Sequence, residues 1–251
     1  MPSQDSSKTI HFDILTLFPG MFEGPFRESI LKRAQAEGRV TIQVHDLRAY
    51  TLNKHGKVDD YPFGGGAGLV MGVEPIARAL EAIRPKRPGA HTVLLSPSGG
   101  RFDQDKARVL SQKPALILIC GRYEGVDARV ARFWADEELS IGDFVLSGGE
   151  VAAMAVVDAV ARLIPGVLGD PASLEEESFA QGLLEYPQYT RPREFRGQTV
   201  PEVLVSGDHK KIKAWQRREA LLKTARNRPD LLDRFPLDDE DRRILKEFEI
   251  G

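Results

Sequence analysis

Hydrophobic positions alternate between strand-like and helix-like spacing along the first two thirds of the chain. Apolar runs of strand length stand at 10–18, 39–47, 91–96, 115–120 and 137–142. Amphipathic stretches of helical period lie between and after them, at 26–38, 74–83, 101–112, 125–134 and 150–164. The run ALILIC at 115–120 is apolar throughout, which is expected of a strand covered by helices on both faces. The alternation predicts an α/β fold with a largely parallel sheet and helices on both faces.

The regular pattern ends near residue 165. From there to about residue 188 the chain is rich in proline, glycine and serine and carries the acidic run 175–177, which predicts a linker or mobile loop. Two further amphipathic helices are predicted at 209–227 and 238–249. We therefore expect a domain at 1–164, a flexible interdomain linker at 165–188 and a small helical domain at 189–251.

Composition narrows the class of protein. Hydrophobic residues make up 41% and charged residues 29%, as in ordinary soluble globular proteins. No apolar run approaches the ~20 residues of a membrane span, and the short polar start does not resemble a secretory signal. The single cysteine, Cys120, ends an apolar strand and is expected to be a buried thiol in a reducing cytoplasm. The five histidines show no ligand spacing, so no metal site is predicted.

The net charge of −2 conceals a basic segment. Residues 209–228 contain eight lysines or arginines and a single acid, Glu219. Helical spacing places Lys210, Lys213 and Arg217 on one face of the predicted helix. Such a face is suited to a polyanionic partner, and a merely solvated surface is the competing interpretation.

Two glycine-punctuated turns, 121–125 and 142–149, each follow a short apolar run. Glycine allows a ligand to lie against the main chain, and parallel strands collect such turns at one sheet edge. The turn predicted at 96–101 also follows a strand. The sequence therefore predicts one binding crevice near a group of polar side chains: Tyr123, Glu124, Asp127, Asp143 and Glu150.

The segment 59–72 is a further glycine-rich loop. It fails the G-x-G-x-x-G pattern at the last position and lacks the Gly-Lys-Ser/Thr of a phosphate-binding loop. No acidic residue stands where a dinucleotide ribose would need one, which disfavours a nicotinamide enzyme. The flanking residues Asp59, Asp60, Pro62 and Phe63 indicate a wall that can contact a planar base, with a simple flexible loop as the competing interpretation.

Eight segments in order give the chain a family resemblance: FPGMF (18–22), YPFGGGAGLVM (61–71), LLSPSGGR (94–101), ICGRYEGVD (119–127), SIGDFVLSGGE (140–150), DAVARLIPGVLG (158–169), ESFAQGLLEYPQYTRP (177–192) and VLVSGDH (203–209). Together they resemble the bacterial tRNA (guanine-N1)-methyltransferases, the TrmD family. The resemblance extends from about Ile10 to the C-terminal helices, nearly the whole chain.

The resemblance implies a SPOUT-class, trefoil-knotted sheet in a homodimer whose active site lies at the subunit interface. Topology rules alone favour an unknotted, doubly wound sheet. The implied cofactor is S-adenosylmethionine, held by the knotted loops at the matching positions Leu94, Leu95, Ser96, Gly121, Tyr123, Glu124, Ser140, Ile141, Gly142, Asp143, Phe144, Val145, Leu146, Gly148 and Gly149. Magnesium is expected only as an effector, without a dedicated protein site.

The implied substrate is tRNA with a guanine 3′ of its anticodon, preceded by another guanine, and the product is 1-methylguanine. Guanine N1 must lose its proton, so a carboxylate base is needed, and an arginine can stabilise charge on O6. The resemblance places the base at Glu177 and the arginine at Arg162. It also implies that Glu177 comes from the subunit opposite the one that holds the cofactor. Family members commonly carry aspartate at the base position, which leaves Glu176 as an alternative. Expected substrate contacts are Pro62, Phe63, Gly64, Asp127, Tyr189, Arg191, Arg193, Lys210, Lys213 and Arg217.

Two other functions stay open on the sequence. A ribose 2′-O-methyltransferase of the SPOUT class would share the fold but lack the GGGAG loop and the ESF motif. A non-catalytic tRNA-binding module is favoured only by the glutamate at position 177.

Overall fold

A computed structural model describes residues 9–169, 177–180 and 182–249. The chain forms two compact units, residues 1–169 and 170–251. The core of the first extends to Val167, and Leu183 packs in the core of the second. The two ends of the predicted linker, 165–188, therefore contribute to the two cores.

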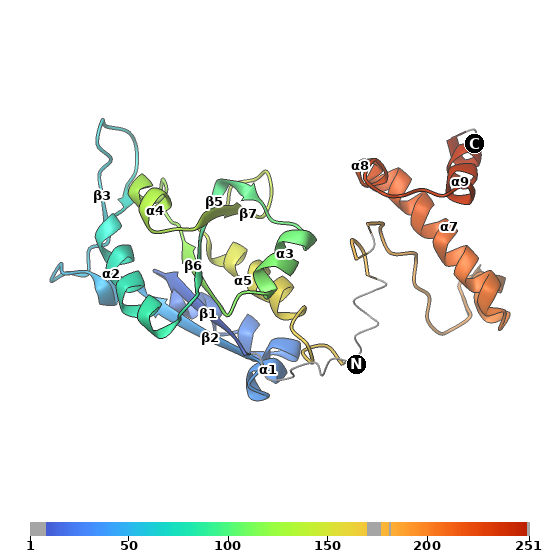
Figure 1. Cartoon of the computed structure of the whole chain (residues 1–251), viewed down its shortest axis with the longest axis horizontal. Coiled ribbons are helices and arrows are strands. Elements are labelled where there is room, and N and C mark those ends of the chain that lie inside the picture. The colour runs from blue at the N-terminus through green and yellow to red at the C-terminus, as the bar shows by residue number, and fades with distance from the viewer. Residues whose placement is uncertain (1–8, 170–176, 181, 250–251) are drawn as a thin grey trace. The chain divides into compact units, whose positions relative to one another are not determined.

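A parallel five-stranded sheet forms the centre of the first unit (Figure 1). Its strand order is β2-β1-β6-β5-β7. The bounds are β1 (Ile10–Thr16), β2 (Val40–Asp46), β5 (His91–Arg101), β6 (Ala115–Cys120) and β7 (Glu137–Ser140). This confirms the predicted α/β fold with a largely parallel sheet.

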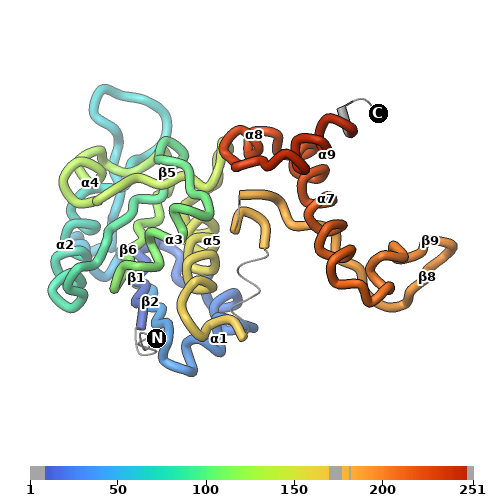
Figure 2. The backbone as a smooth tube through the Cα atoms, turned by 45° about the vertical axis from the view of Figure 1, so that its right-hand side comes forward, coloured from blue at the N-terminus to red at the C-terminus, as the bar shows by residue number. Residues whose placement is uncertain are grey.

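Helices cover both faces of this sheet (Figures 1 and 2). Successive side chains of a strand point to opposite faces, so Phe12 and Ile14 of β1 enter one core while Leu15 enters the other. The first core includes side chains of α1 (Ser29–Ala36), α3 (Gln104–Ser111) and α5 (Glu150–Ala161), and the second those of α2 (Val73–Ile83) and α4 (Ala128–Phe133). Short 3-10 helices join these elements: η1 (Pro19–Phe22), η2 (Pro25–Arg27), η3 (Leu47–Tyr50) and η4 (Arg84–Lys86).

The predicted turn at 96–101 is wrong, because β5 continues to Arg101. The pairing of β5 with β7 shifts register between Leu95 and Gly100 and then resumes. Gly99 makes this possible: a Cβ atom there would lie 2.3 Å from the backbone nitrogen of Leu139. The strand is thus interrupted by an irregularity instead of ending in a turn.

The glycine-rich segment 61–69 is a loop closed by two short strands that the sequence analysis missed. β3 (Asp59–Asp60) pairs antiparallel with β4 (Val70–Met71), and the loop projects above β3 in Figure 1. Phe63 at its tip is fully exposed. Strands of two residues have no periodicity that a sequence pattern could reveal.

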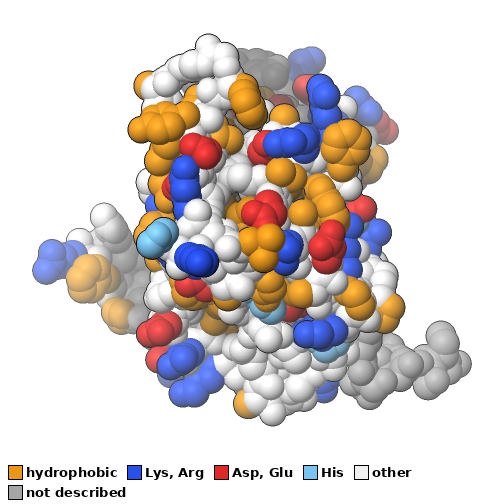
Figure 3. Space-filling view, turned by 90° about the vertical axis from the view of Figure 1, so that its left-hand side faces the viewer, with side chains coloured by type: hydrophobic (Ala, Val, Ile, Leu, Met, Phe, Trp, Pro, Cys, Tyr) orange, Lys and Arg blue, Asp and Glu red, His pale blue; other side chains and the backbone are white. Residues whose placement is uncertain are grey.

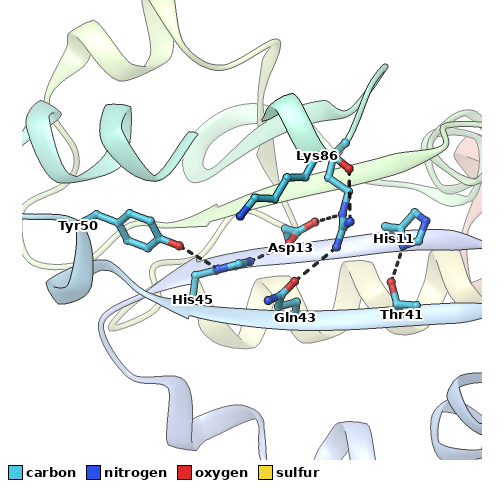
Figure 4. Close-up of polar contacts among 8 residues, drawn as sticks. His11, Asp13, Thr41, Gln43, His45, Tyr50 and Lys86 are labelled. Carbon is cyan, nitrogen blue, oxygen red and sulfur yellow. Dashed lines mark hydrogen bonds and ion pairs between the residues drawn. The ribbon is translucent and has the colours of Figure 1, made fainter. Parts of the chain in front are cut away.

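A buried carboxylate lies on the α2 side of the sheet (Figure 4). Asp13 is 1% exposed; it accepts hydrogen bonds from Arg87 Nε (2.8 Å) and His45 Nε2 (2.7 Å). His45 Nδ1 in turn lies 3.2 Å from the Tyr50 hydroxyl. Burial alone would raise the pKa of Asp13, but the hydrogen bonds from His45 and Arg87 outweigh it and hold the pKa below its usual value.

The second unit is small and largely helical, with α7 (His209–Asn227), α8 (Pro229–Leu232), α9 (Asp239–Glu249) and η5 (Glu202–Val205). Its core is built on Leu183, Ala220 and Leu221. The hairpin of β8 (Glu194–Phe195) and β9 (Gln198–Thr199) lies beside one end of α7, and α8 and α9 lie near the other (Figure 2). Buried Thr224 joins α7 to the preceding segment, because its hydroxyl accepts a hydrogen bond from Leu184 N at 2.9 Å.

Candidate active site

A cavity of about 450 Å³ opens at the carboxyl ends of the strands in the first unit. It is lined by residues 94–98 of β5, by 121–126 after β6, and by β7 and the loop after it, with α4 and α5 behind. Crevices at this edge of an open α/β sheet are where ligands bind. The volume falls within the roughly 300–1,000 Å³ typical of small-molecule sites.

Fourteen of the fifteen positions matched to cofactor binding line this one cavity. Asp143 is the exception within the described part of the chain, and its side chain is exposed. The lining also includes residues that the sequence analysis did not select, among them Arg122, Val126, Ala131, Glu138 and Ala152. Arg122 belongs to the turn predicted at 121–125 and Val126 directly follows it, whereas Ala131 and Ala152 lie on helices and carry no local motif that would have revealed them.

The two glycine turns are joined by main-chain contacts. Gly149 N donates to Gly121 O at 2.9 Å, and Arg122 and Gly148 form an isolated β-bridge. A Cβ atom at Gly149 would lie 2.8 Å from the Cα of Cys120. Glycine is therefore required for this approach, as the sequence analysis proposed for the turns in general.

The projecting glycine-rich loop is anchored to the rim of the same cavity. Glu124 N donates to Leu69 O at 3.0 Å and Met71 N to Gly125 O at 2.9 Å. A Cβ atom at Gly68 would lie 2.5 Å from Cγ of Glu124, so the loop backbone packs directly against that side chain. The expected base-contacting residues Pro62, Phe63 and Gly64 are thus carried by a loop whose base is fixed to the cavity wall.

The face of the first unit that carries α2 and this loop has mixed charge. In Figure 3, basic and acidic side chains alternate with hydrophobic ones across the surface, and no single sign dominates. Two acidic residues, Glu124 and Glu138, are among those that line the cavity. The pKa of Tyr123 is raised above its ordinary value by burial and by a hydrogen bond with Asp59, so the phenol stays protonated.

Asp127 begins α4 and is held by one neighbour. Its carboxylate accepts hydrogen bonds from Arg129 N (2.9 Å), Nε (2.9 Å) and Nη2 (2.6 Å). The side-chain bonds from Arg129 hold the pKa of Asp127 below its usual value despite some burial. Asp127 is thus ionised and already bonded to Arg129. A target base that contacts Asp127, as predicted, would have to share the carboxylate with this arginine.

The two residues matched to catalysis belong to different units. Arg162 is half-buried at the C-terminal end of α5, where its backbone nitrogen donates to Asp158 O at 3.2 Å. Glu177 is half-buried in the second unit, where its carbonyl accepts from Ala180 N at 3.0 Å. The alternative base, Glu176, lies outside the described residues.

The expected RNA contacts of the second unit differ in their surroundings. Lys210 and Lys213 are exposed on α7, but Arg217 is bonded to Asp241. Arg193 pairs with Glu202 at 2.8 Å. Arg191 and Tyr189 are exposed, and the centre of the Tyr189 ring lies 6.2 Å from that of half-buried Trp215.

Two other features are absent from the described residues. They hold no group of three histidine, cysteine, aspartate or glutamate side chains placed to bind a metal ion. Within the same ranges, no helix combines the length and the apolar character needed to cross a membrane.

Comparison with known proteins gives a consistent result. A family model for tRNA (guanine-1)-methyltransferase TrmD matches residues 10–234. The chain is 55% identical over 240 residues to the tRNA (guanine-N(1)-)-methyltransferase of Geobacter metallireducens, covering 96% of this chain and 98% of the relative. The protein of that name from Geobacillus kaustophilus is 53% identical over 96% of this chain and 98% of its own. The protein of that name from Carboxydothermus hydrogenoformans is 58% identical over 93% of this chain and 91% of its own.

Proposed function

The chain belongs to the TrmD family of tRNA (guanine-1)-methyltransferases, and from this premise we propose how its residues carry out the reaction. The protein is a methyltransferase that acts on N1 of guanine in tRNA. The observation that carries this conclusion is a family match from residue 10 to residue 234, which includes the whole lining of the cavity. A match of this length decides against the ribose-methylating and non-catalytic alternatives.

We infer that the cavity binds S-adenosylmethionine, which when bound supplies an electrophilic methyl group on a sulfonium. The lining suits this cofactor, because apolar Leu94, Leu95 and Ile141 can contact its adenine while the glycine turns offer main-chain groups. Glu124 and Glu138 are suited to its positive charge. Gly142 supports the fit: its φ is +152° and a Cβ atom would lie 2.6 Å from the Phe144 ring.

We propose that Glu177 removes the N1 proton of guanine. Guanine N1 is protonated and weakly nucleophilic at neutral pH, so a carboxylate within hydrogen-bond reach accelerates the transfer by about 10²–10⁴-fold. The residue is half-buried and is therefore only partly solvated. Glutamate is one methylene longer than the aspartate common in the family. The turn 177–180 must therefore hold the backbone of Glu177 slightly further from the base.

Arg162 is proposed to stabilise the negative charge that develops on O6 as N1 loses its proton. This charge exists mainly in the transition state, so the contribution of Arg162 falls on turnover more than on binding. Arg162 directly follows α5, the helix whose first turn lines the cavity through Ala152, so Arg162 is connected to the cavity wall by one rigid element.

The target is proposed to be the guanine 3′ of the anticodon, with the loop 61–64 as a wall for the base. Direct bonds of the loop to the cavity rim support this placement. Exposed Lys210 and Lys213 on α7 are proposed to contact tRNA phosphates, which fix the RNA without reading its sequence. A tRNA substrate also supports a proposed cytoplasmic location.

We further propose a homodimer with a trefoil knot in each first unit. The exposed apolar side chains of Phe18, Met21 and Val151, on the neighbouring elements η1 and α5, support an interface there. The return of the loop after β7 to the turn after β6, where Gly149 N donates to Gly121 O, supports the knot.

The function is tested by methyl transfer from labelled S-adenosylmethionine to two unmodified tRNA transcripts. One carries guanine 3′ of the anticodon and the other adenine, and Glu177→Gln is assayed beside the wild type. Guanine-dependent transfer that is lost in the variant is the expected result. Transfer that ignores the guanine would overturn the proposed target, and full activity of the variant would move the base to another carboxylate.

A further inference from the structure

Glu150 is a fully buried carboxylate at the first position of α5, immediately behind the cavity wall. None of the roles described above uses it. We propose that Glu150 is a positioning residue: through Arg122 it fixes the two glycine turns around the cofactor and cancels the arginine charge beside a cationic ligand. This inference rests on the proposed binding of S-adenosylmethionine.

Both oxygens of Glu150 are bonded to side chains from distant parts of the sequence. Oε2 accepts from Arg122 Nε at 2.9 Å, and Oε1 accepts from the Thr16 hydroxyl at 2.8 Å. Thr16 ends β1, and its hydroxyl also accepts from Phe18 N at 2.9 Å. An unpaired carboxylate at 0% exposure would be very costly, so these partners and the N-terminus of α5 must all contribute.

Arg122 extends the same network to the cavity. Its Nη1 donates to Ser147 O at 3.1 Å, which ties the turn after β6 to the loop after β7. Its guanidinium lies 4.4 Å from the centre of the Phe18 ring, so η1 covers it from outside. Arg122 itself lines the cavity. The Glu150–Arg122 pair therefore connects three segments, 16–18, 121–122 and 147–150, behind one wall of the cofactor site.

Gly148 leaves the space that this pair occupies. A Cβ atom there would lie 2.2 Å from Arg122 Nε and 2.6 Å from Glu150 Oε2. The φ of Gly148 is not in the left-handed region, so backbone conformation does not demand glycine at this position. The Arg122–Glu150 contact therefore explains this glycine of the SGGE motif.

The charge of the pair matters because the proposed ligand is a cation. With Glu150 ionised, the Glu150–Arg122 pair has no net charge, and Glu124 and Glu138 are the other charged residues that line the cavity. With Glu150 replaced by glutamine, the shape and two hydrogen-bonding atoms remain, but the arginine charge is uncompensated in a poorly solvated place. S-adenosylmethionine carries one more positive charge than S-adenosylhomocysteine. A change in the charge of the site should therefore alter the ratio of the two Kd values, whereas a change in its shape should alter both Kd values alike.

The test measures the Kd of both ligands by calorimetry for the wild type, Glu150→Gln, Glu150→Asp and Thr16→Val. Glu150→Gln is expected to weaken S-adenosylmethionine at least tenfold and S-adenosylhomocysteine by a clearly smaller factor. Thr16→Val, which keeps the charge, should weaken both equally and only a few-fold. Glu150→Asp should retain the ratio of the two Kd values while weakening both.

Asp13→Asn is the matched control. Asp13 is likewise a buried carboxylate paired with an arginine in the first unit (Figure 4), but it is not among the residues that line the cavity. Its loss should lower the melting temperature and leave the ratio of the two Kd values unchanged. Should Glu150→Gln not fold, Thr16→Val and Glu150→Asp still decide: wild-type Kd values for both would overturn the proposal.

The outcomes separate this inference from the function on which it rests. A wild-type protein that binds neither ligand refutes the proposed cofactor. A wild type that binds both, together with a Glu150→Gln variant that has the same two Kd values or an unchanged ratio, refutes the role of Glu150 alone.

Discussion

Arg217 and Asp241 form a two-point ion pair between α7 and α9. Nε of the arginine donates to Oδ1 at 3.0 Å and Nη2 to Oδ2 at 2.6 Å, and the carboxylate is 1% exposed. The guanidinium also lies 4.8 Å from the centre of the Phe235 ring. A residue predicted from the sequence as an RNA contact thus also holds the second unit together.

Arg217→Ala should therefore destabilise the second unit. Removing the arginine leaves a buried carboxylate without its main partner, at a cost of roughly 2–3 kcal/mol in unfolding free energy. Denaturant unfolding checks this, with Arg218→Ala as control, because Arg218 pairs with Glu219 at the surface of the same helix and should contribute little. Equal stability of the two variants would contradict the structural role.

Lys210 and Lys213 are expected to act on tRNA affinity without affecting stability. Both are exposed, so replacing them together with alanine should weaken binding and reduce the slope of log K against log salt by about 1.5–2. The measurement is a salt titration of tRNA binding. Lys246→Ala, an exposed lysine on α9, serves as control. An unchanged slope in the double variant would assign the two lysines to the solvated surface.

Arg162→Ala should reduce turnover at least about a hundredfold while leaving the Kd of the cofactor nearly unchanged, because it acts on charge that appears in the transition state. Single-turnover kinetics and calorimetry check the two quantities separately. Arg162→Lys keeps the charge and should recover part of the rate. An equal loss in cofactor binding would place Arg162 in the cofactor site instead.

Mixed dimers test which subunit supplies the base. If Glu177 acts on the cofactor site of the partner subunit, a dimer of Arg162→Ala with Glu177→Gln contains one intact site. A random mixture of two inactive variants should then recover about a quarter of wild-type activity. If both residues act within one subunit, no mixture can be active. Co-purification with two different tags isolates the mixed dimer for the assay.

Asp13 gives the first unit a predictable response to acid. Because its folded-state pKa lies below that of the unfolded chain, the unfolded state binds more protons, and stability falls as pH drops from about 4 through the folded pKa. Asp13→Asn should cost roughly 3–5 kcal/mol at neutral pH and flatten the loss below about pH 4. Unfolding free energies between pH 2.5 and 7 check both effects. An identical acid limb in the variant would refute this linkage.

Much of the first unit could be predicted because its signals are local. The run ALILIC forms β6 with the predicted bounds, and the glycine turns after the strands do line one cavity. The contacts that could not be predicted join residues far apart in the sequence. Thr16 is hydrogen-bonded to Glu150, 134 residues away in the sequence, and Arg217 to Asp241, 24 residues away. No periodicity or motif records such pairs, since they depend on how the elements pack.

The lining of the cavity includes glycine at 121, 142, 148 and 149, where the main chain is not covered by a side chain of its own. Side chains at three of these positions would collide with backbone, with Phe144 or with the Arg122–Glu150 pair. Consider a competing small molecule that hydrogen-bonds to the main chain at these glycines. A substitution there could hardly block the competitor without also disturbing the binding of the natural ligand. Substitutions that confer resistance to such a molecule should consequently fall at non-glycine positions of the lining and not at these glycines.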